Sequence, residues 1–229
     1  MTVLENIWKI LQRYPNLFLI GTGYTLLLSA ITVVCASFLG ALIALMRRSR
    51  LHIGGFYPLR LIATIYIEII RGTPMLLQLY FFYFLVPMIF PLLELSDFTS
   101  ITVACVVNSS AYVAEIIRAG IDAVDKGQTE AARSLGLNSR QTMLRVVLPQ
   151  AVKNILPALC NEFVMVIKET SLASTFFIGE LMTQYKTISG ALFLTIEPLI
   201  IVGCIYFILT FTLSKCISVF ERRLKASDR

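Results

Sequence analysis

Long apolar segments constrain the fold of this chain more than any other feature of its sequence. They occupy residues 18–46, 59–90, 99–119, 155–178 and 198–219. About 20 consecutive apolar residues are needed to cross a bilayer as a helix, and each segment reaches that length. Hydrophobic residues make up 57% of the chain and charged residues 15%, which leaves too few polar faces to cover five buried helices in water. We therefore predict an all-α integral membrane protein with five transmembrane helices.

Lysines and arginines concentrate in alternate connections between the predicted spans. They are frequent in the first connection, the third connection and the C-terminal tail, whereas the leader holds only Lys9 and Arg13. The first connection contains no acidic residue and carries Arg47, Arg48, Arg50 and Arg60. Because basic residues stay cytoplasmic, the N-terminus is predicted outside and the C-terminus inside. The same charges attract an anionic membrane surface, and their spread over three connections does not indicate nucleic-acid binding.

The N-terminal residues are predicted to lie in the membrane interface. Leu4, Ile7, Trp8 and Leu11 fall on one helical face, and tryptophan is a typical interfacial anchor. An ordinary leader segment is the alternative. The predicted regions of the chain are an interfacial segment at 1–16, a transmembrane domain at 17–223 with a cytoplasmic loop at 122–153, and a cytoplasmic tail at 224–229.

Catalytic and metal-binding patterns are missing from the sequence. The five cysteines lie in or at the ends of apolar segments without a Cys-x-x-Cys pair, and the single histidine, His52, lies in a basic turn. No serine has a plausible base partner. The sequence also lacks the Gly-x-x-x-x-Gly-Lys-Ser/Thr loop that holds nucleotide phosphates. We expect no enzyme activity and no cofactor on this chain, so energy must come from a partner or an ion gradient.

The connection between the third and fourth spans is predicted to form two polar helices. Asp125, with Gln128 three residues later, predicts a capped helix start, and Gly136 predicts a left-handed end. Ser139 is expected to cap a second helix, which Pro149 ends or kinks. Such a folded polar surface between two apolar spans indicates either docking of a soluble partner or packing against the chain's own bundle.

The sequence of this polar loop resembles a known family. Glu130-Ala131-Ala132, followed by Gly136 and Leu148-Pro149, is similar to the EAA loop of ABC importer permeases. The likeness covers residues 21–223, and further segments resemble the branch that takes up polar amino acids of the histidine, glutamine, arginine or cystine type. These segments are Gly23-Tyr24-Thr25-Leu26, Arg71-Gly72-Thr73-Pro74, Asn108-Ser109-Ser110-Ala111-Tyr112-Val113-Ala114-Glu115, Asn161-Glu162-Phe163 and Lys168-Glu169-Thr170-Ser171-Leu172.

The resemblance implies a type I ABC importer permease in a bacterial cytoplasmic membrane. Its expected partners are two ATP-binding subunits that carry ATP and magnesium, a second permease subunit in a homodimer or heterodimer, and an external solute-binding protein. The solute-binding protein would deliver a polar amino acid near residues 94–97 and 179–189. The residues expected to couple to the ATP-binding subunit are Gln128, Glu130, Ala131, Ala132, Arg133, Leu135 and Gly136.

Polar groups inside the spans need a partner or a function, because burial in lipid is costly. Pro74 should break the second span beside Arg71, whose guanidinium would hold a substrate carboxylate or pair with Glu68 or a neighbouring helix. Glu115 and Arg118 are expected to form a structural pair. The predicted substrate-pathway residues are Glu68, Arg71, Thr73, Asn108, Ser109, Tyr112, Glu162 and Glu169.

Two further expectations concern helix packing and the fourth span. Glu162 and Glu169 share a helical face, where they would meet a substrate amino group or seal a gate, with Lys168 neutralising one of them. Small residues at four-residue spacing, as at Ala36 and Gly40, allow close helix contact within one subunit or across a dimer. Five helices make a thin wall, so a second permease is expected around a two-fold axis.

Two other functions fit the same residues. An ion-coupled carrier would use Glu68, Glu162 or Glu169 as proton relays and would need no ATPase. A membrane anchor or sensor would use the cytoplasmic helices to recruit a regulatory protein without transporting anything.

Overall fold

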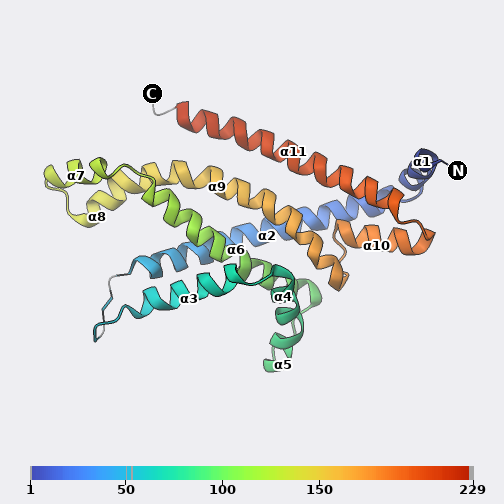
Figure 1. Ribbon diagram of the computed structural model, residues 1–229, viewed down its shortest axis with the longest axis horizontal. Coiled ribbons are helices and arrows are strands. Elements are labelled where there is room, and N and C mark those ends of the chain that lie inside the picture. Colours follow the sequence, from blue (N-terminus) through green and yellow to red (C-terminus); the bar gives the residue numbers. More distant parts are fainter. Residues whose placement is uncertain (1, 50, 53, 227–229) are drawn as a thin grey trace. The chain divides into compact units, whose positions relative to one another are not determined.

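The computed structural model describes residues 2–49, 51–52 and 54–226, and these residues form helices joined by short connections (Figure 1). The α-helices are α1 (Val3–Arg13), α2 (Pro15–Arg48), α3 (Pro58–Gly72), α4 (Met75–Tyr80), α5 (Val86–Ile89), α6 (Asp97–Asp122), α7 (Lys126–Ser134), α8 (Ser139–Thr142), α9 (Leu148–Glu169), α10 (Leu181–Leu192) and α11 (Ile196–Ala226). Two π-helical turns, η1 (Phe81–Leu85) and η2 (Met143–Val147), and one 3-10 helix, η3 (Thr170–Phe176), continue them.

The helices account for four of the five predicted spans directly, and for the fifth when one bent pair is counted as a single span. The continuous helical segments long and apolar enough to cross a membrane are Pro15–Arg48, Asp97–Asp122, Ser139–Phe176 and Ile196–Arg223. The helices α3 and α4 to α5 make the fifth span as a bent pair. The chain is therefore a multi-pass membrane protein.

The second span breaks at Pro74, as predicted. Thr73 and Pro74 both have extended backbone angles, and the helices on either side meet at 108°. Proline cannot donate a backbone hydrogen bond and disfavours helical geometry at the preceding residue, which explains the break. The Thr73 hydroxyl donates to the Ile69 carbonyl at 2.9 Å, which satisfies a backbone group beside the break.

The expectation that Pro149 ends a short helix is wrong. The helix continues from α8 through η2 into α9, where Pro149 is the second residue. In η2 the Leu148 amide donates to the Met143 carbonyl, five residues earlier, which widens the turn just before the proline. A widened turn removes the contact between the proline ring and the preceding carbonyls that normally bends a helix.

Helix capping differs in detail from the prediction. Asn138, rather than Ser139, caps α8, since its Oδ1 accepts the Gln141 amide and the Gln141 Oε1 accepts the Asn138 amide, both at 2.9 Å. Asp125 caps α7 by accepting the Gly127 amide at 2.7 Å. The predicted reciprocal bond from Gln128 is replaced by a 3.4 Å contact to Gln150.

The N-terminal helix α1 forms as predicted, and Ile10 packs it against the rest of its unit. Thr2 and Glu5 cap it reciprocally, Ile10 is buried, and Ile7 packs beside it. Leu4 and Trp8 remain exposed, at 78% and 64%. Their exposure is compatible with the interfacial location, which remains a prediction.

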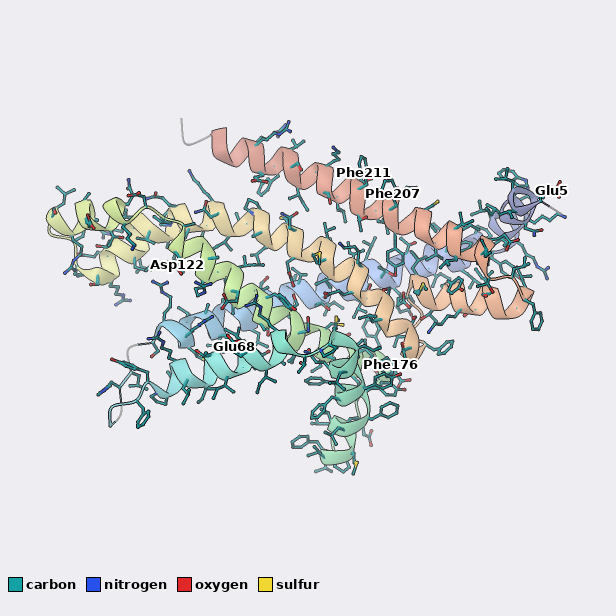
Figure 2. The ribbon with its side chains drawn as sticks, viewed as in Figure 1. Glu5, Glu68, Asp122, Phe176, Phe207 and Phe211 are labelled. Atoms are coloured by element: carbon teal, nitrogen blue, oxygen red, sulfur yellow. The ribbon has the colours of Figure 1, made fainter. Side chains whose placement is uncertain are left out.

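The described chain divides into two compact units. The first contains residues 1–34, 74–106 and 163–214, and the second contains 35–73, 107–162 and 215–229. In the first unit, Phe176 of η3 contacts the rings of Tyr80 and Tyr83 at centroid distances of 5.1 and 4.6 Å (Figure 2). The same unit contains α10, which sequence reasoning missed because its twelve residues are shorter than a span and mixed in polarity.

In the second unit, the small residues of α2 pack against α6 within the subunit. Ala36 and Ala44 are buried at 0% and 4% exposure, and Ala44 shares a core with Ala111 and Ala114. A Cβ at Gly40 would lie 2.7 Å from the Val113 side chain and 2.8 Å from the Ser110 carbonyl oxygen. Glycine at this position is therefore required by the close approach of two helix backbones.

Replacing Gly40 with alanine is expected to destabilise the protein by about 1–3 kcal/mol, because the added methyl overpacks against backbone. Thermal unfolding in detergent measures this. Gly23→Ala is the matched control, since a Cβ at Gly23 meets no atom within 4 Å. Equal unfolding temperatures for the two variants would contradict the assigned contact.

Candidate functional site

The polar loop folds into a compact helical hairpin of α7 and α8. At the end of α7, the Leu137 amide donates to the Ala132 carbonyl at 3.1 Å, and Gly136 has a φ of 85°. This is the left-handed termination predicted from Gly136, and it closes the hairpin without leaving those groups unpaired. Arg133 stiffens the turn, because its Nη1 lies 3.3 Å from the Leu137 carbonyl oxygen and from the Ser139 hydroxyl.

Most of the predicted coupling residues are exposed on this hairpin. Leu135 is the most exposed apolar side chain there, at 82%, and Glu130 has no cationic partner among the described residues. Ala132 is the exception, since it is only 5% exposed and packs inside the hairpin. Of the two alanines in the predicted set, only Ala131 is exposed. The remaining exposed members of the set are Gln128, Arg133 and Gly136.

Glu115 of α6 is the centre of an arginine cluster in the second unit. Its carboxylate pairs with Arg47 of α2, with Arg118 at 2.8 Å and with Arg71 of α3 at 3.9 Å. The Glu115 side chain is only 16% exposed. The predicted Glu115–Arg118 pair is confirmed. Arg47 was not among the candidates, although a basic residue ending the first span signals a cytoplasmic boundary.

Arg71 is held by a neighbouring helix and not by Glu68. Besides Glu115, its guanidinium lies 5.5 Å from the centre of the Tyr112 ring, within cation–π distance. Glu68 is exposed on α3 and has no ion pair among the described residues (Figure 2). The Arg71 side chain remains 43% exposed, so part of it is accessible to a ligand.

The predicted polar groups of α6 are buried among their own neighbours. Asn108 and Ser109 are 3% and 1% exposed. The Ser109 hydroxyl donates to the Glu162 carboxylate at 2.7 Å, so these two predicted residues lie together. Their burial argues against an open pathway surface at Asn108 and Ser109 in the isolated subunit.

Tyr66 of α3 completes this polar group and was missed from the sequence. Its hydroxyl lies 2.8 Å from the Val107 carbonyl oxygen and 2.7 Å from the Ser110 hydroxyl. A tyrosine within a predicted span was the available signal, because a buried hydroxyl usually finds a partner.

The carboxylates of α9 are only partly buried. Glu162 and Glu169 are intermediate in exposure, whereas Lys168 is exposed. No ion pair of Lys168 with a carboxylate is present among the described residues, so its neutralising role remains a prediction. The length of the lysine side chain allows it to extend towards the surface instead.

Replacing Glu115 with glutamine should destabilise the fold, because three arginines lose their shared carboxylate. The free energy of unfolding should fall by about 2 kcal/mol. This is less than the ~3–5 kcal/mol expected for a fully buried pair, because the arginines are partly exposed. Glu68→Gln is the control for stability, since Glu68 lacks an ion pair among the described residues. Comparable thermal unfolding of both variants in detergent would show that Glu115 does not hold the cluster together.

Comparison with known proteins places the chain in a family. Residues 36–226 match the family described as binding-protein-dependent transport system inner membrane component. The arginine transport system permease protein ArtQ of Bacillus subtilis is 38% identical over 91% of this chain and 92% of its own length. The L-cystine transport system permease protein TcyB of the same organism is 36% identical over 97% of this chain and 89% of its own.

A solved structure supports the same assignment. The crystal structure of an amino acid ABC transporter with histidines contains a chain that is 44% identical, with a TM-score of 0.88 over 97% of this chain and 99% of that one. The chain therefore belongs to the binding-protein-dependent transport system inner membrane components, as the permease subunit of an amino acid ABC importer.

Proposed function

We propose that this permease translocates a polar amino acid delivered by an external solute-binding protein, with energy from ATP hydrolysed on a separate subunit. The relatives that carry arginine and L-cystine in their names, and the transporter crystallised with histidines, support a polar amino acid as substrate. We infer the energy source from the folded, exposed hairpin that contains α7. The runner-up carrier would have no use for such a hairpin.

The hairpin has the properties of a docking element for the ATP-binding subunits. It is folded independently of a partner by the Asp125 cap and the left-handed turn at Gly136. It presents an exposed apolar side chain, Leu135, and an exposed carboxylate, Glu130, that pairs with no cation among the described residues. An exposed apolar group together with a charge of defined position is what a specific protein interface uses. We assign coupling to the exposed members of the predicted set, with Ala132 supporting them from inside.

The proposed location is the bacterial cytoplasmic membrane, with the hairpin in the cytoplasm. The distribution of basic residues supports an external N-terminus, with residues 1–16 in the interface, 17–223 as the permease domain and 224–229 as a tail. Two such permeases, identical or related, would surround the pathway. The solute-binding protein would reach residues 94–97 and 179–189 from outside.

The proposed substrate contacts centre on Arg71. Its partly exposed guanidinium is oriented by Glu115 and Tyr112 and lies beside the helix break at Thr73. A guanidinium can accept a substrate carboxylate through two parallel hydrogen bonds. Glu68 and the partly buried Glu162 and Glu169 would meet an amino group or close the pathway. Asn108 and Ser109 would act by holding Glu162 and α6 in place.

Charge reversal of Glu130 tests the docking proposal. Glu130→Lys should insert into the membrane normally but lower coupled uptake by about ten-fold or more, as expected when a close interfacial charge pair is lost. Uptake and ATP hydrolysis are measured together in proteoliposomes containing the ATP-binding and solute-binding proteins. Glu130→Gln keeps the side chain's size and should have a smaller effect. Uptake driven by a proton gradient in vesicles without ATP-binding subunits would contradict the proposal and favour the ion-coupled carrier.

Substitution of Arg71 tests the pathway assignment. Arg71→Gln should raise the substrate concentration needed for half-maximal uptake by about 10–100-fold, because a hydrogen bond to a charged group is lost. Assembly should persist, since Arg71 is the most distant of the Glu115 partners at 3.9 Å. Arg145→Gln is the matched control, because it removes an exposed arginine outside both the proposed pathway and the Glu115 cluster. If Arg71→Gln transports as well as the control variant, Arg71 is a structural residue and does not contact the substrate.

A further inference from the structure

The end of α2 and the start of α3 border two adjoining cavities that open to the surface and are lined by arginines. One has a volume of about 390 Å³ and is lined by Arg47, Arg48, Ser49, Tyr57 and Arg60. The other, of about 300 Å³, shares its three arginines and adds Arg118 and Asp122 at the end of α6 (Figure 2). All of these residues belong to the second unit, so the cavities are features of one compact body.

The acidic groups nearby are too few to neutralise these arginines. Glu115 pairs with Arg47 and Arg118, while Asp122 lies 3.3 Å from Arg48 and 3.0 Å from Arg118. Arg60 has no carboxylate within 4.0 Å in the part of the chain that the structure describes. Four guanidinium groups therefore share two carboxylates, and the cavities retain a net positive charge beside Arg60.

An apolar surface begins next to this positive charge. Tyr57, Leu61, Ile65 and Ile69 follow one another at four-residue intervals along α3, which places them on one helical face. They are 45%, 54%, 48% and 58% exposed. A ligand in the arginine-lined cavity that also covers this face needs an anionic end and a long apolar body.

We propose that the cavities bind the phosphate headgroup of an anionic phospholipid, whose acyl chain lies along the exposed face of α3. Arginine forms paired hydrogen bonds with phosphate oxygens, and basic pockets between transmembrane helices on the cytoplasmic side favour anionic headgroups. A free phosphate ion would leave the α3 face uncovered. An acidic protein surface would have to enter cavities of a few hundred Å³, whereas a single headgroup needs no such insertion.

The test measures retained lipid on the full transporter complex in nanodiscs that contain phosphatidylglycerol in phosphatidylcholine. After extraction into mild detergent, native mass spectrometry counts the bound phosphatidylglycerol. Arg60→Gln and the double variant Arg48→Gln/Arg60→Gln should weaken retention by about five-fold for each lost positive charge. Arg60→Gln removes no ion pair with a described residue, so it should leave folding unchanged. Arg145→Gln, an exposed arginine outside the cavities, is the matched control and should retain lipid like the wild type.

Several outcomes would overturn this inference. Equal retention by Arg60→Gln and Arg145→Gln would show that phosphatidylglycerol binds elsewhere. If inorganic phosphate displaces phosphatidylglycerol at equal concentration, or binds where the lipid does not, the cavities hold a small free anion. If the double variant loses a protein subunit from the complex while keeping its lipid, the arginines form a protein interface instead.

Discussion

The pairing of Glu115 with arginines from three helices is the interaction on which the second unit depends. Each of those arginines would be costly in an apolar bilayer without a counter-charge, and a single carboxylate serves them all. Because Arg47, Arg71 and Arg118 come from α2, α3 and α6, the shared carboxylate also fixes how these helices meet. The close contact at Gly40 acts in the same place, since it lets α2 approach α6 near enough for the ion pairs to form.

The need to satisfy backbone polar groups at a proline explains the irregular helices. At Pro74 the chain bends, and the Thr73 hydroxyl takes up the Ile69 carbonyl that the broken helix would leave open. At Pro149 the chain instead widens by one π-helical turn and continues straight into α9. The same residue type thus has opposite effects, and the difference lies in the turn that precedes it.

The spans, the break at Pro74 and the end of α7 at Gly136 could be predicted because each depends on local chemistry. Apolar length sets the spans, proline lacks an amide hydrogen, and glycine tolerates a positive φ. The partners of Arg71 could not be predicted, because Tyr112 and Glu115 are more than forty residues away and only packing brings them together. The burial of Asn108, Ser109 and Ala132 was missed for the same reason. The sequence does not show which neighbouring residue a polar or small side chain contacts in the fold.

The ion pairs also provide a physical route between the hairpin and the helix break. Asp122 ends α6 three residues before the Asp125 cap of the hairpin, and Arg118 joins Asp122 to Glu115. Glu115 in turn reaches Arg71 beside the break at Thr73. A displacement of the hairpin by a docked subunit would therefore act on charges that are already linked to Arg71. Coupling of this kind requires the linked groups to have two stable arrangements. Arg71 is the group in this cluster whose position a displaced hairpin would change most easily, because its 3.9 Å contact with Glu115 is the longest of the three.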